Sequence, residues 1–274
     1  MSVEREQAAP AAEQSVSFDT SVAHMARVYD YWLGGKDNFA ADRAAAEQAI
    51  AVNPGILRDV RANRAYLARA VRYLAAECGI RQFLDLGTGI PTASNTHEVA
   101  QSVAPECRVV YVDNDPVVLA HARALLTGEP EGATDYIDAD LRNTAEILEA
   151  ARRTLDFSQP VAVTLLAILH LIPDTADPYG IVATLMDAVP PGSYLALSHP
   201  ASDIRPAAVA EMAKRVNARL GSTRGTMRGQ AEVTRFFDGL ELVRPGVVQP
   251  PQWRPVDVVP EAEIAVWCGV ARKP

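Results

Sequence analysis

Short apolar runs recur along this chain, and several of them end in an acidic residue or a glycine turn. Such runs, without polar alternation, are typical of parallel strands that helices bury on both faces. The predicted strands cover residues 82–86, 108–113, 136–141, 161–170, 193–198, 240–248 and 264–271. The pattern therefore predicts an extended sheet that occupies most of the chain.

Apolar residues recur at helical spacing between these runs. The expected helices cover residues 57–77, 96–103, 178–189, 205–220 and a stretch around 231–237. Strands that alternate with helices predict an α/β fold, in which right-handed crossovers build a mainly parallel sheet with helices on both faces. In such a sheet, ligands bind at the carboxyl ends of the central strands.

The first predicted strand ends in a glycine turn, Gly87-Thr-Gly89, with Asp85 just before it. Glycine lets the backbone pass close to a ligand where a Cβ atom would collide, although a two-glycine turn after a strand is often only a turn. Asp113, at the end of the next strand, favours the functional interpretation, because a carboxylate there can accept both hydroxyls of a ribose. Together the two features predict a nucleoside site.

The segment before the sheet is rich in aromatic residues. Residues 21–33 are expected to form a helix that ends at Gly34-Gly35, and a second helix opens near residues 36–43. The aromatic cluster consists of Tyr29, Tyr31, Trp32 and Phe39. The polar side chains beside it are Asp30, Lys36 and Asn38. The cluster either pins this segment to the sheet or belongs to a lid over the ligand, hinged at the two glycines.

Composition limits the classes of function. The chain has 274 residues, of which 49% are hydrophobic and 22% charged, as expected for one large α/β domain with an appendage. A net charge of −8 and a pI near 5.2 oppose general nucleic-acid binding. The arginines of the 57–77 helix are Arg58, Arg61, Arg64, Arg69 and Arg72. We interpret them as a solvated helix face rather than a nucleic-acid stripe, because they alternate with apolar positions.

The cysteines and the chain start bear on location. Cys78, Cys107 and Cys268 lie far apart and share no ligand spacing with one another or with a histidine. This indicates a reducing compartment and no structural zinc, so we expect no metal site. No apolar run is long enough to span a bilayer, and the first residues have no signal-peptide core, so we expect a cytoplasmic protein without membrane contact.

With these residues in view, the chain resembles the class I S-adenosylmethionine-dependent methyltransferases over roughly residues 57–271. Four stretches more narrowly resemble an actinomycete family named S-adenosyl methyltransferase, which has no general assigned substrate. They cover residues 26–39, 83–92, 110–116 and 236–243. The resemblance implies a Rossmann-like seven-stranded sheet, in the order 3-2-1-4-5-7-6 with strand 7 antiparallel, and an N-terminal helical cap.

The sheet accounts for the chain from about residue 57, which suggests a domain division, and the resemblance implies a cofactor. We expect a disordered N-terminal tail over residues 1–17, a helical cap or lid over 18–56 and a methyltransferase domain over 57–274. The implied cofactor is S-adenosylmethionine. Pro91 stands where many methyltransferases have a third glycine, which suggests a wider loop before the next helix.

Cofactor contacts are carried over residue by residue. Asp85 and the two glycines of the turn match the first methyltransferase motif, and Asp113 matches the ribose-binding acid. Asp140 with Leu141 matches the pair that contacts adenine, with Asp138 as a rival at the same strand end. The full candidate set is Tyr29, Lys36, Asn38, Asp85, Gly87, Thr88, Gly89, Asp113, Asn114, Asp140, Leu141 and Ala167.

The chemistry of methyl transfer fits these residue types. Asp85 can favour the ammonium of S-adenosylmethionine, and backbone N–H groups of the turn can face its carboxylate. The reaction is an in-line displacement, so positioning supplies most of the acceleration, and a general base is needed only if the acceptor must lose a proton. His170, expected at the end of the 161–170 strand, is either that base or a histidine satisfied by a backbone carbonyl.

Other functions compete with methyl transfer. A non-catalytic nucleoside-binding regulatory protein could keep the same fold. A nicotinamide-dependent oxidoreductase is disfavoured, because the turn lacks a third small residue and Asp85 precedes the glycines. Enzymes that methylate base amino groups resemble one another in an Asn- or Asp-Pro-Pro-aromatic turn, whereas this chain has Ala167-Ile-Leu-His170. A small-molecule methyl acceptor is therefore favoured over a nucleic acid.

Overall fold

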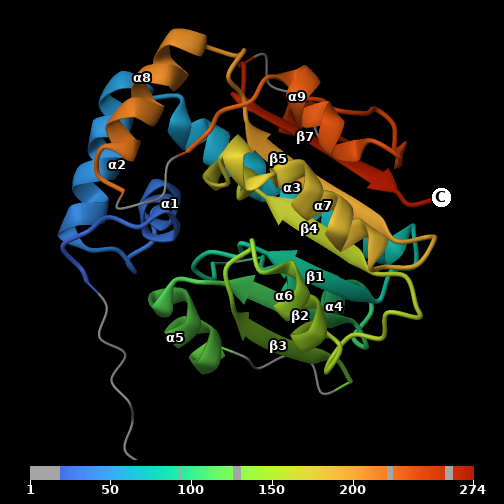
Figure 1. Ribbon diagram of the computed structural model, residues 1–274. Coiled ribbons are helices and arrows are strands. Elements are labelled where there is room, and N and C mark those ends of the chain that lie inside the picture. Colours follow the sequence, from blue (N-terminus) through green and yellow to red (C-terminus); the bar gives the residue numbers. More distant parts are fainter. Residues whose placement is uncertain (1–18, 93, 126–130, 221–224, 257–261) are drawn as a thin grey trace, which may run out of the picture.

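A seven-stranded sheet forms the centre of the molecule (Figure 1). The computed structural model describes residues 19–92, 94–125, 131–220, 225–256 and 262–274, so the expected N-terminal tail lies outside the described residues. The strands are β1 Gln82–Leu86, β2 Arg108–Asp113, β3 Ala133–Asp138, β4 Ala162–Leu166, β5 Tyr194–Pro200, β6 Glu241–Leu242 and β7 Val266–Arg272. Their order is β3-β2-β1-β4-β5-β7-β6, and β7 alone pairs antiparallel, with β5 and β6. The predicted α/β class and strand order are confirmed.

Helices cover both faces of this sheet (Figure 1). They are α3 Ile56–Ala76, α4 Thr96–Val103, α5 Pro116–Leu125, α6 Thr144–Ala151, α7 Pro178–Asp187 and α9 Gln230–Thr234. On one face, α3 and α4 join an apolar cluster that contains Phe83 of β1. On the other face, α6 and α7 join a cluster that contains Leu84 of the same strand. Successive side chains of β1 are thus buried on opposite faces, which explains its unbroken apolar run.

Three helices form a cap beside the sheet rather than on it. These are α1 Met25–Leu33, α2 Ala40–Val52 and α8 Pro206–Asn217. They share an apolar cluster that includes Val28, Trp32, Ala46, Met212 and Val216. Figure 1 shows α8 lying along α2, although more than half of the chain separates them in sequence. The cap is therefore built from the N-terminal segment and from the connection that follows β5.

Two strand ends differ from the sequence prediction, and both changes move candidate residues. β3 ends at Asp138, so Asp140 lies in the following loop. β4 ends at Leu166, because Ala167 adopts a left-handed φ of 52° and the chain then enters a 3₁₀ turn over Leu169–Leu171. The expectation that His170 ends a strand is therefore wrong.

The strand predicted over residues 240–248 is also shorter than expected. β6 has only two residues, since the N–H of Gly246 donates to the carbonyl of Val243 in a turn. Val248 then makes an isolated bridge to Cys268 of β7. In the described part of the chain, no helix is long and apolar enough to cross a membrane.

Candidate functional site

A cavity of about 700 Å³ lies between the cap and the carboxyl ends of the central strands. Its walls come from α1, the start of α3, α8, and the loops that follow β1, β2, β3 and β4. The candidate residues that line it are Tyr29, Asp85, Gly87, Thr88, Gly89, Asp113, Asn114, Asp140, Leu141, Ala167 and His170. The fold thus gathers eleven of the thirteen predicted site residues around one space.

The glycine turn after β1 leaves room on the cavity side. Both glycines adopt left-handed backbone conformations, with φ of 73° at Gly87 and 67° at Gly89. A Cβ atom on Gly87 would lie 2.3 Å from the side chain of Ile168, so this position must stay bare. A Cβ atom on Gly89 would meet no atom within 4 Å. The space beside Gly89 is therefore available to a ligand that approaches the backbone closely.

Asp113 is held rigidly at the tip of β2. Its Oδ2 accepts the backbone N–H of Gly89 at 2.8 Å, and its Oδ1 accepts the N–H groups of Asn114 and Asp115 at 2.9 and 3.0 Å. The side chain is buried, and burial raises the pKa of the carboxyl despite these donors. Oδ1 already accepts two N–H groups, whereas Oδ2 accepts only that of Gly89, so Oδ2 keeps a lone pair that can accept a hydrogen bond from the cavity.

Asp85 is buried beneath the turn. Its Oδ2 accepts the hydroxyl of Thr96 at 2.6 Å and its Oδ1 accepts the hydroxyl of Thr164 at 2.7 Å. Burial raises the pKa of Asp85, and the two threonine hydroxyls partly oppose that rise. Thr96 is the first residue of α4, whose N-cap residue Asn95 donates its backbone N–H to the carboxylate of Glu98 at 2.8 Å. Asp85 therefore links β1, β4 and the start of α4 behind the turn.

The loop after β3 separates the two acids that compete for the adenine role. Asp140 lines the cavity, whereas Asp138 is exposed and lies outside the lining. The carboxylate of Asp140 accepts the backbone N–H of Arg142 at 2.9 Å and its Nε at 2.8 Å. The side chain of Arg142 lowers the pKa of Asp140. Leu141 is buried beside it and presents an apolar wall.

Lys36 and Asn38 do not line the cavity. Lys36 is exposed, and Asn38 is buried between α1 and α2. The amide of Asn38 donates to Oδ2 of Asp30 at 2.8 Å and to the carbonyl of Gly35 at 3.1 Å. A Cβ atom on Gly35 would overlap the Asp30 carboxylate, and the N–H groups of Gly34 and Gly35 both bond to carbonyls of α1. These residues therefore hold a tight turn rather than a free hinge.

Tyr29 and helix α1 face the cavity. The hydroxyl of Tyr29 donates to the carbonyl of Val60 at 3.3 Å and accepts the amide of Asn63 at 2.9 Å. Both partners belong to α3, so the tyrosine joins the cap to the helix that packs on the sheet. Burial raises the pKa of this phenol. Of the aromatic cluster, Tyr29 and Trp32 line the cavity, whereas Tyr31 and Phe39 do not.

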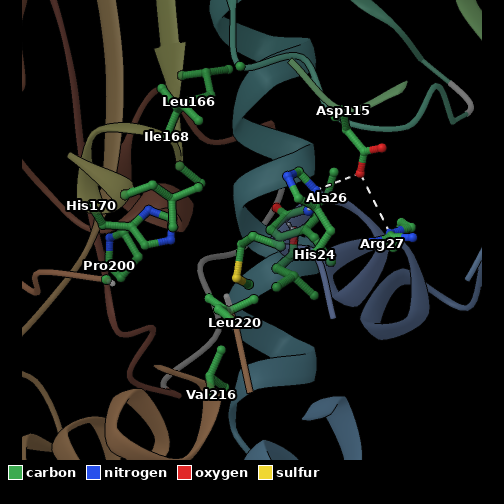
Figure 2. Close-up of a pocket in the computed structure, with 18 of the residues that line it drawn as sticks. His24, Ala26, Arg27, Asp115, Leu166, Ile168, His170, Pro200, Val216 and Leu220 are labelled. Atoms are coloured by element: carbon green, nitrogen blue, oxygen red, sulfur yellow. Dashed lines mark hydrogen bonds and ion pairs between the residues drawn. The ribbon is translucent and has the colours of Figure 1, made fainter. Parts of the chain in front are cut away.

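An ion pair ties α1 to the end of β2. Nδ1 of His24, the N-cap of α1, lies 2.6 Å from Oδ2 of Asp115, and Nε of Arg27 lies 3.6 Å from the same oxygen (Figure 2). Oδ1 of Asp115 accepts the N–H of Val117 at the start of α5. Burial alone would raise the pKa of Asp115, but the contacts with His24, Val117 and Arg27 together outweigh it and lower the pKa. Sequence reasoning missed this pair, although an acid before Pro116 signals a helix start.

His170 lies in the wall opposite α1 (Figure 2). Its side chain is 6% exposed, and Nδ1 is buried without a hydrogen-bond partner. Burial, aided by the neighbouring His199 and Arg228, lowers the pKa of His170 to about 3. The imidazole is therefore neutral near pH 7. A neutral imidazole with so low a pKa is a weak general base but remains a hydrogen-bonding group.

Two residues behind His170, Arg228 and His199, were not predicted from the sequence to belong to the site. Arg228 is 1% exposed, and it donates to the carbonyls of Leu169 and Ile172 at 3.0 Å. Its Nη1 also lies 3.0 Å from Nε2 of His199, whose Nδ1 lies 2.8 Å from the carbonyl of Pro200. Arg228 therefore fixes the backbone that carries His170. No sequence motif marks an arginine in a loop as buried, so only the structure reveals this role.

Ala167 connects the cavity to β5. Its N–H donates to both the carbonyl and the hydroxyl of Ser198 at 3.0 Å. These bonds hold the left-handed conformation, which costs a residue with a Cβ atom about 1–2 kcal/mol.

The described residues contain no group of three or more histidine, cysteine, aspartate or glutamate side chains arranged to hold a metal ion.

Comparison with known proteins gives a consistent family. A family profile described as S-adenosyl methyltransferase matches residues 11–274. The chain is 48% identical to a DUF574 family protein from Streptomyces avermitilis MA-4680, with a TM-score of 0.90 over 93% of this chain and 99% of that one. It is 44% identical to a candidate methyltransferase from Thermobifida fusca YX, with a TM-score of 0.87 over 93% and 96% of the chains.

A solved structure of low sequence identity resembles this chain in its fold alone. The plantazolicin methyltransferase BpumL is 10% identical to this chain and has a TM-score of 0.53 over 90% of this chain and 95% of its own. No match was found among proteins of curated function.

Proposed function

This chain belongs to the S-adenosyl methyltransferase family, so its cofactor is S-adenosylmethionine, and we propose that it methylates a small-molecule acceptor inside the cavity under the cap. The observation that carries this proposal is the fixed carboxylate of Asp113 next to the empty space at Gly89. A nucleoside needs a ribose acceptor and a bare backbone side by side, and both are present at the same strand edge.

The residues present fit this cofactor. We assign the ribose hydroxyls to Asp113 and the adenine ring to Leu141, with Asp140 as acceptor for the adenine amino group. Thr88 and Asn114 flank these groups on the two loops. We assign the cofactor's ammonium to Asp85, which lines the cavity behind the glycine turn. Bound S-adenosylmethionine supplies an electrophilic methyl group on a sulfonium sulfur.

We assign water exclusion and positioning of the acceptor to the cap and the strand ends. Residues 18–56 form the proposed lid, with α8 as its second half, and α1 covers the cavity through Ala26 and Tyr29. Such a cover excludes water from a cationic reacting centre and holds the acceptor in line with the transferred methyl group. His170 serves as a positioning residue for the acceptor, because its neutral imidazole has little capacity to keep a proton.

The size and closure of the cavity favour a small acceptor. A space of about 700 Å³ must hold both the cofactor and the acceptor, and cavities of this order match drug-sized ligands. The cap helices lie at the carboxyl ends of the central strands (Figure 1), and α1 and α8 supply part of the cavity wall, which leaves less room for a polymer. A net charge of −8 also opposes a nucleic-acid acceptor.

The test is methyl transfer from radiolabelled S-adenosylmethionine to an actinomycete extract, which is then separated into small-molecule, protein and nucleic-acid fractions. We expect label in a low-molecular-weight product with wild type and at least about tenfold less with Asp113→Ala, because a charge-assisted bond contributes about 1.5–3 kcal/mol. Label in protein or nucleic acid alone would contradict the acceptor class. Cofactor binding without any transfer would favour a non-catalytic binding protein.

A further inference from the structure

One part of the cavity, across from Asp115 in Figure 2, has apolar walls. We call it the acceptor chamber. Its residues are Leu166, Ile168, His170, Pro200, Val216 and Leu220. Figure 2 shows Leu166 and Ile168 above His170, with Val216 and Leu220 below and α1 opposite. The chamber is thus bounded by the end of β4, the end of β5, α8 and α1.

Among the six residues that define the chamber, His170 is the one whose side chain carries nitrogen. Asn217 of α8 lines the same cavity, but its amide already bonds to the backbone of Gly225. Nδ1 of His170 has no hydrogen-bond partner, and the side chain is 6% exposed. The neighbouring His199 makes its own contacts with Arg228 and the carbonyl of Pro200. A buried polar atom without a partner costs about 1–3 kcal/mol, so a ligand group that bonds to this imidazole gains by satisfying it.

Charged groups near the chamber are already paired. Arg228 lies behind His170, outside the cavity lining, and contacts Asp174 at 2.6 Å. Asp59 lines the cavity beside α8, but Arg205 forms an ion pair with it, and the N–H of Ala265 donates to its Oδ1 at 3.0 Å. An ionised ligand in the chamber would therefore lose its hydration without gaining a counter-charge from these residues, which is unfavourable.

Resting on the proposed function, we infer that the acceptor is an uncharged, mainly apolar molecule, which fills the acceptor chamber and hydrogen-bonds through its polar group to His170. The apolar walls exclude water and the imidazole orients the one group that must meet the methyl carbon. This combination selects among small molecules by charge and by the place of a single hydroxyl or other uncharged polar group.

The test uses three naphthalene probes on the full chain saturated with S-adenosylhomocysteine, which removes the sulfonium charge from the comparison. We expect fluorescence titration to give saturable binding of 2-naphthol, at least about tenfold tighter than 2-naphthalenesulfonate or 2-naphthylmethylammonium, because each charged probe must be desolvated unpaired. Equal affinities, or no saturable binding of 2-naphthol, would overturn the inference. Failure to bind S-adenosylhomocysteine would instead refute the proposed function.

A charge placed in the chamber should reverse this preference. Val216→Lys, on the inner face of α8, should weaken 2-naphthol and strengthen 2-naphthalenesulfonate, each by about tenfold or more. Ala210→Lys adds the same charge to an exposed position of the same helix and should change neither affinity. An unchanged preference in a folded Val216→Lys protein would contradict the location of the chamber.

The role of His170 has a separate test that does not depend on the α8 variant. In wild type, 2-naphthol should bind about fivefold tighter than 2-methoxynaphthalene, which cannot donate a hydrogen bond. His170→Phe should make the two probes equal while binding of S-adenosylhomocysteine stays unchanged. A preference that persists in His170→Phe would show that the hydroxyl bonds elsewhere.

Discussion

The backbone N–H of Gly89 donates a 2.8 Å hydrogen bond to Oδ2 of Asp113. This bond joins the turn after β1 to the tip of β2, so the bare backbone and the carboxylate keep a fixed spacing. A ligand that needs both therefore meets a preformed site, and little ordering is required when it binds.

Replacing each glycine of the turn by alanine should affect stability and cofactor binding differently. Gly87→Ala should destabilise the fold by more than about 2 kcal/mol, because left-handed strain adds to overlap with Ile168. Gly89→Ala should cost only the strain, about 1–2 kcal/mol, yet weaken cofactor binding, because its methyl group enters the free space. Urea unfolding and calorimetry separate the effects. Equal stability losses with unchanged binding in Gly89→Ala would contradict a ligand at that place.

The buried histidines make stability depend on pH. Burial lowers the pKa of His170 to about 3 and that of His199 to about 4, from an ordinary 6.5. Their contribution to folding is complete above pH 6.5 and falls as the pH drops toward these values, because the unfolded state then binds more protons. His170→Phe should reduce the slope of unfolding free energy between pH 6 and 4.5 by about 1.4 kcal/mol per pH unit. Equal slopes in both proteins would show that His170 titrates normally.

The ion pair at the N-cap of α1 should hold the cap against β2. Asp115→Asn keeps the bond to Val117 but removes the charge that faces His24 and Arg27. Because the pKa of Asp115 is lowered by folding, the stabilisation exists above the ordinary pKa of 3.8 and is lost as the pH falls below it. We expect a loss of about 1–3 kcal/mol at pH 7 that shrinks as the pH falls below 3.8 through the lowered pKa of the folded state.

Hydrogen exchange locates the effect of Asp115→Asn. Amides of α1 should exchange faster, while those of α6, which lies away from the cap, serve as the internal control. A uniform change across both helices would mean that the pair stabilises the whole fold rather than the cap.

Replacing Arg228 should destabilise the fold more than replacing an arginine on the surface. Arg228→Met leaves the buried carbonyls of Leu169 and Ile172 without their donor, so the variant should lose about 2–4 kcal/mol of stability. Arg153→Met, at an exposed position, is the matched control and should change stability by less than about 0.5 kcal/mol. Similar losses in the two variants would contradict the structural role of Arg228.

The sheet could be predicted because its signals are local. The apolar run of β1 reflects burial on alternate faces. The apolar run of β2 stops at the charged residue Asp113, which is the last residue of the strand. The position of His170 could not be predicted in this way. The apolar sequence before His170 does not indicate that Ala167 adopts a left-handed backbone conformation, because that conformation depends on Ser198 of the neighbouring strand.

The cap was predicted only in part for a similar reason. The aromatic residues of α1 indicated a cover over the cavity, but the matching surface belongs to α8, distant in sequence. An amphipathic helix shows which face it buries and not what buries it. Lys36 and Asn38 were assigned to the site because they neighbour the aromatic residues, whereas the bonds of Asn38 to Asp30 and Gly35 turn the segment away from the cavity.

The most direct test of this account is calorimetric titration of S-adenosylhomocysteine into wild type and Asp113→Ala. Wild type should bind one equivalent, and Asp113→Ala should bind at least about tenfold more weakly with its circular dichroism unchanged, because each lost charge-assisted bond is worth about 1.5–3 kcal/mol before desolvation. Exposed Asp138→Ala is the control and should bind like wild type. Equal affinity of a folded Asp113→Ala protein would contradict the assignment of this carboxylate to the cofactor ribose.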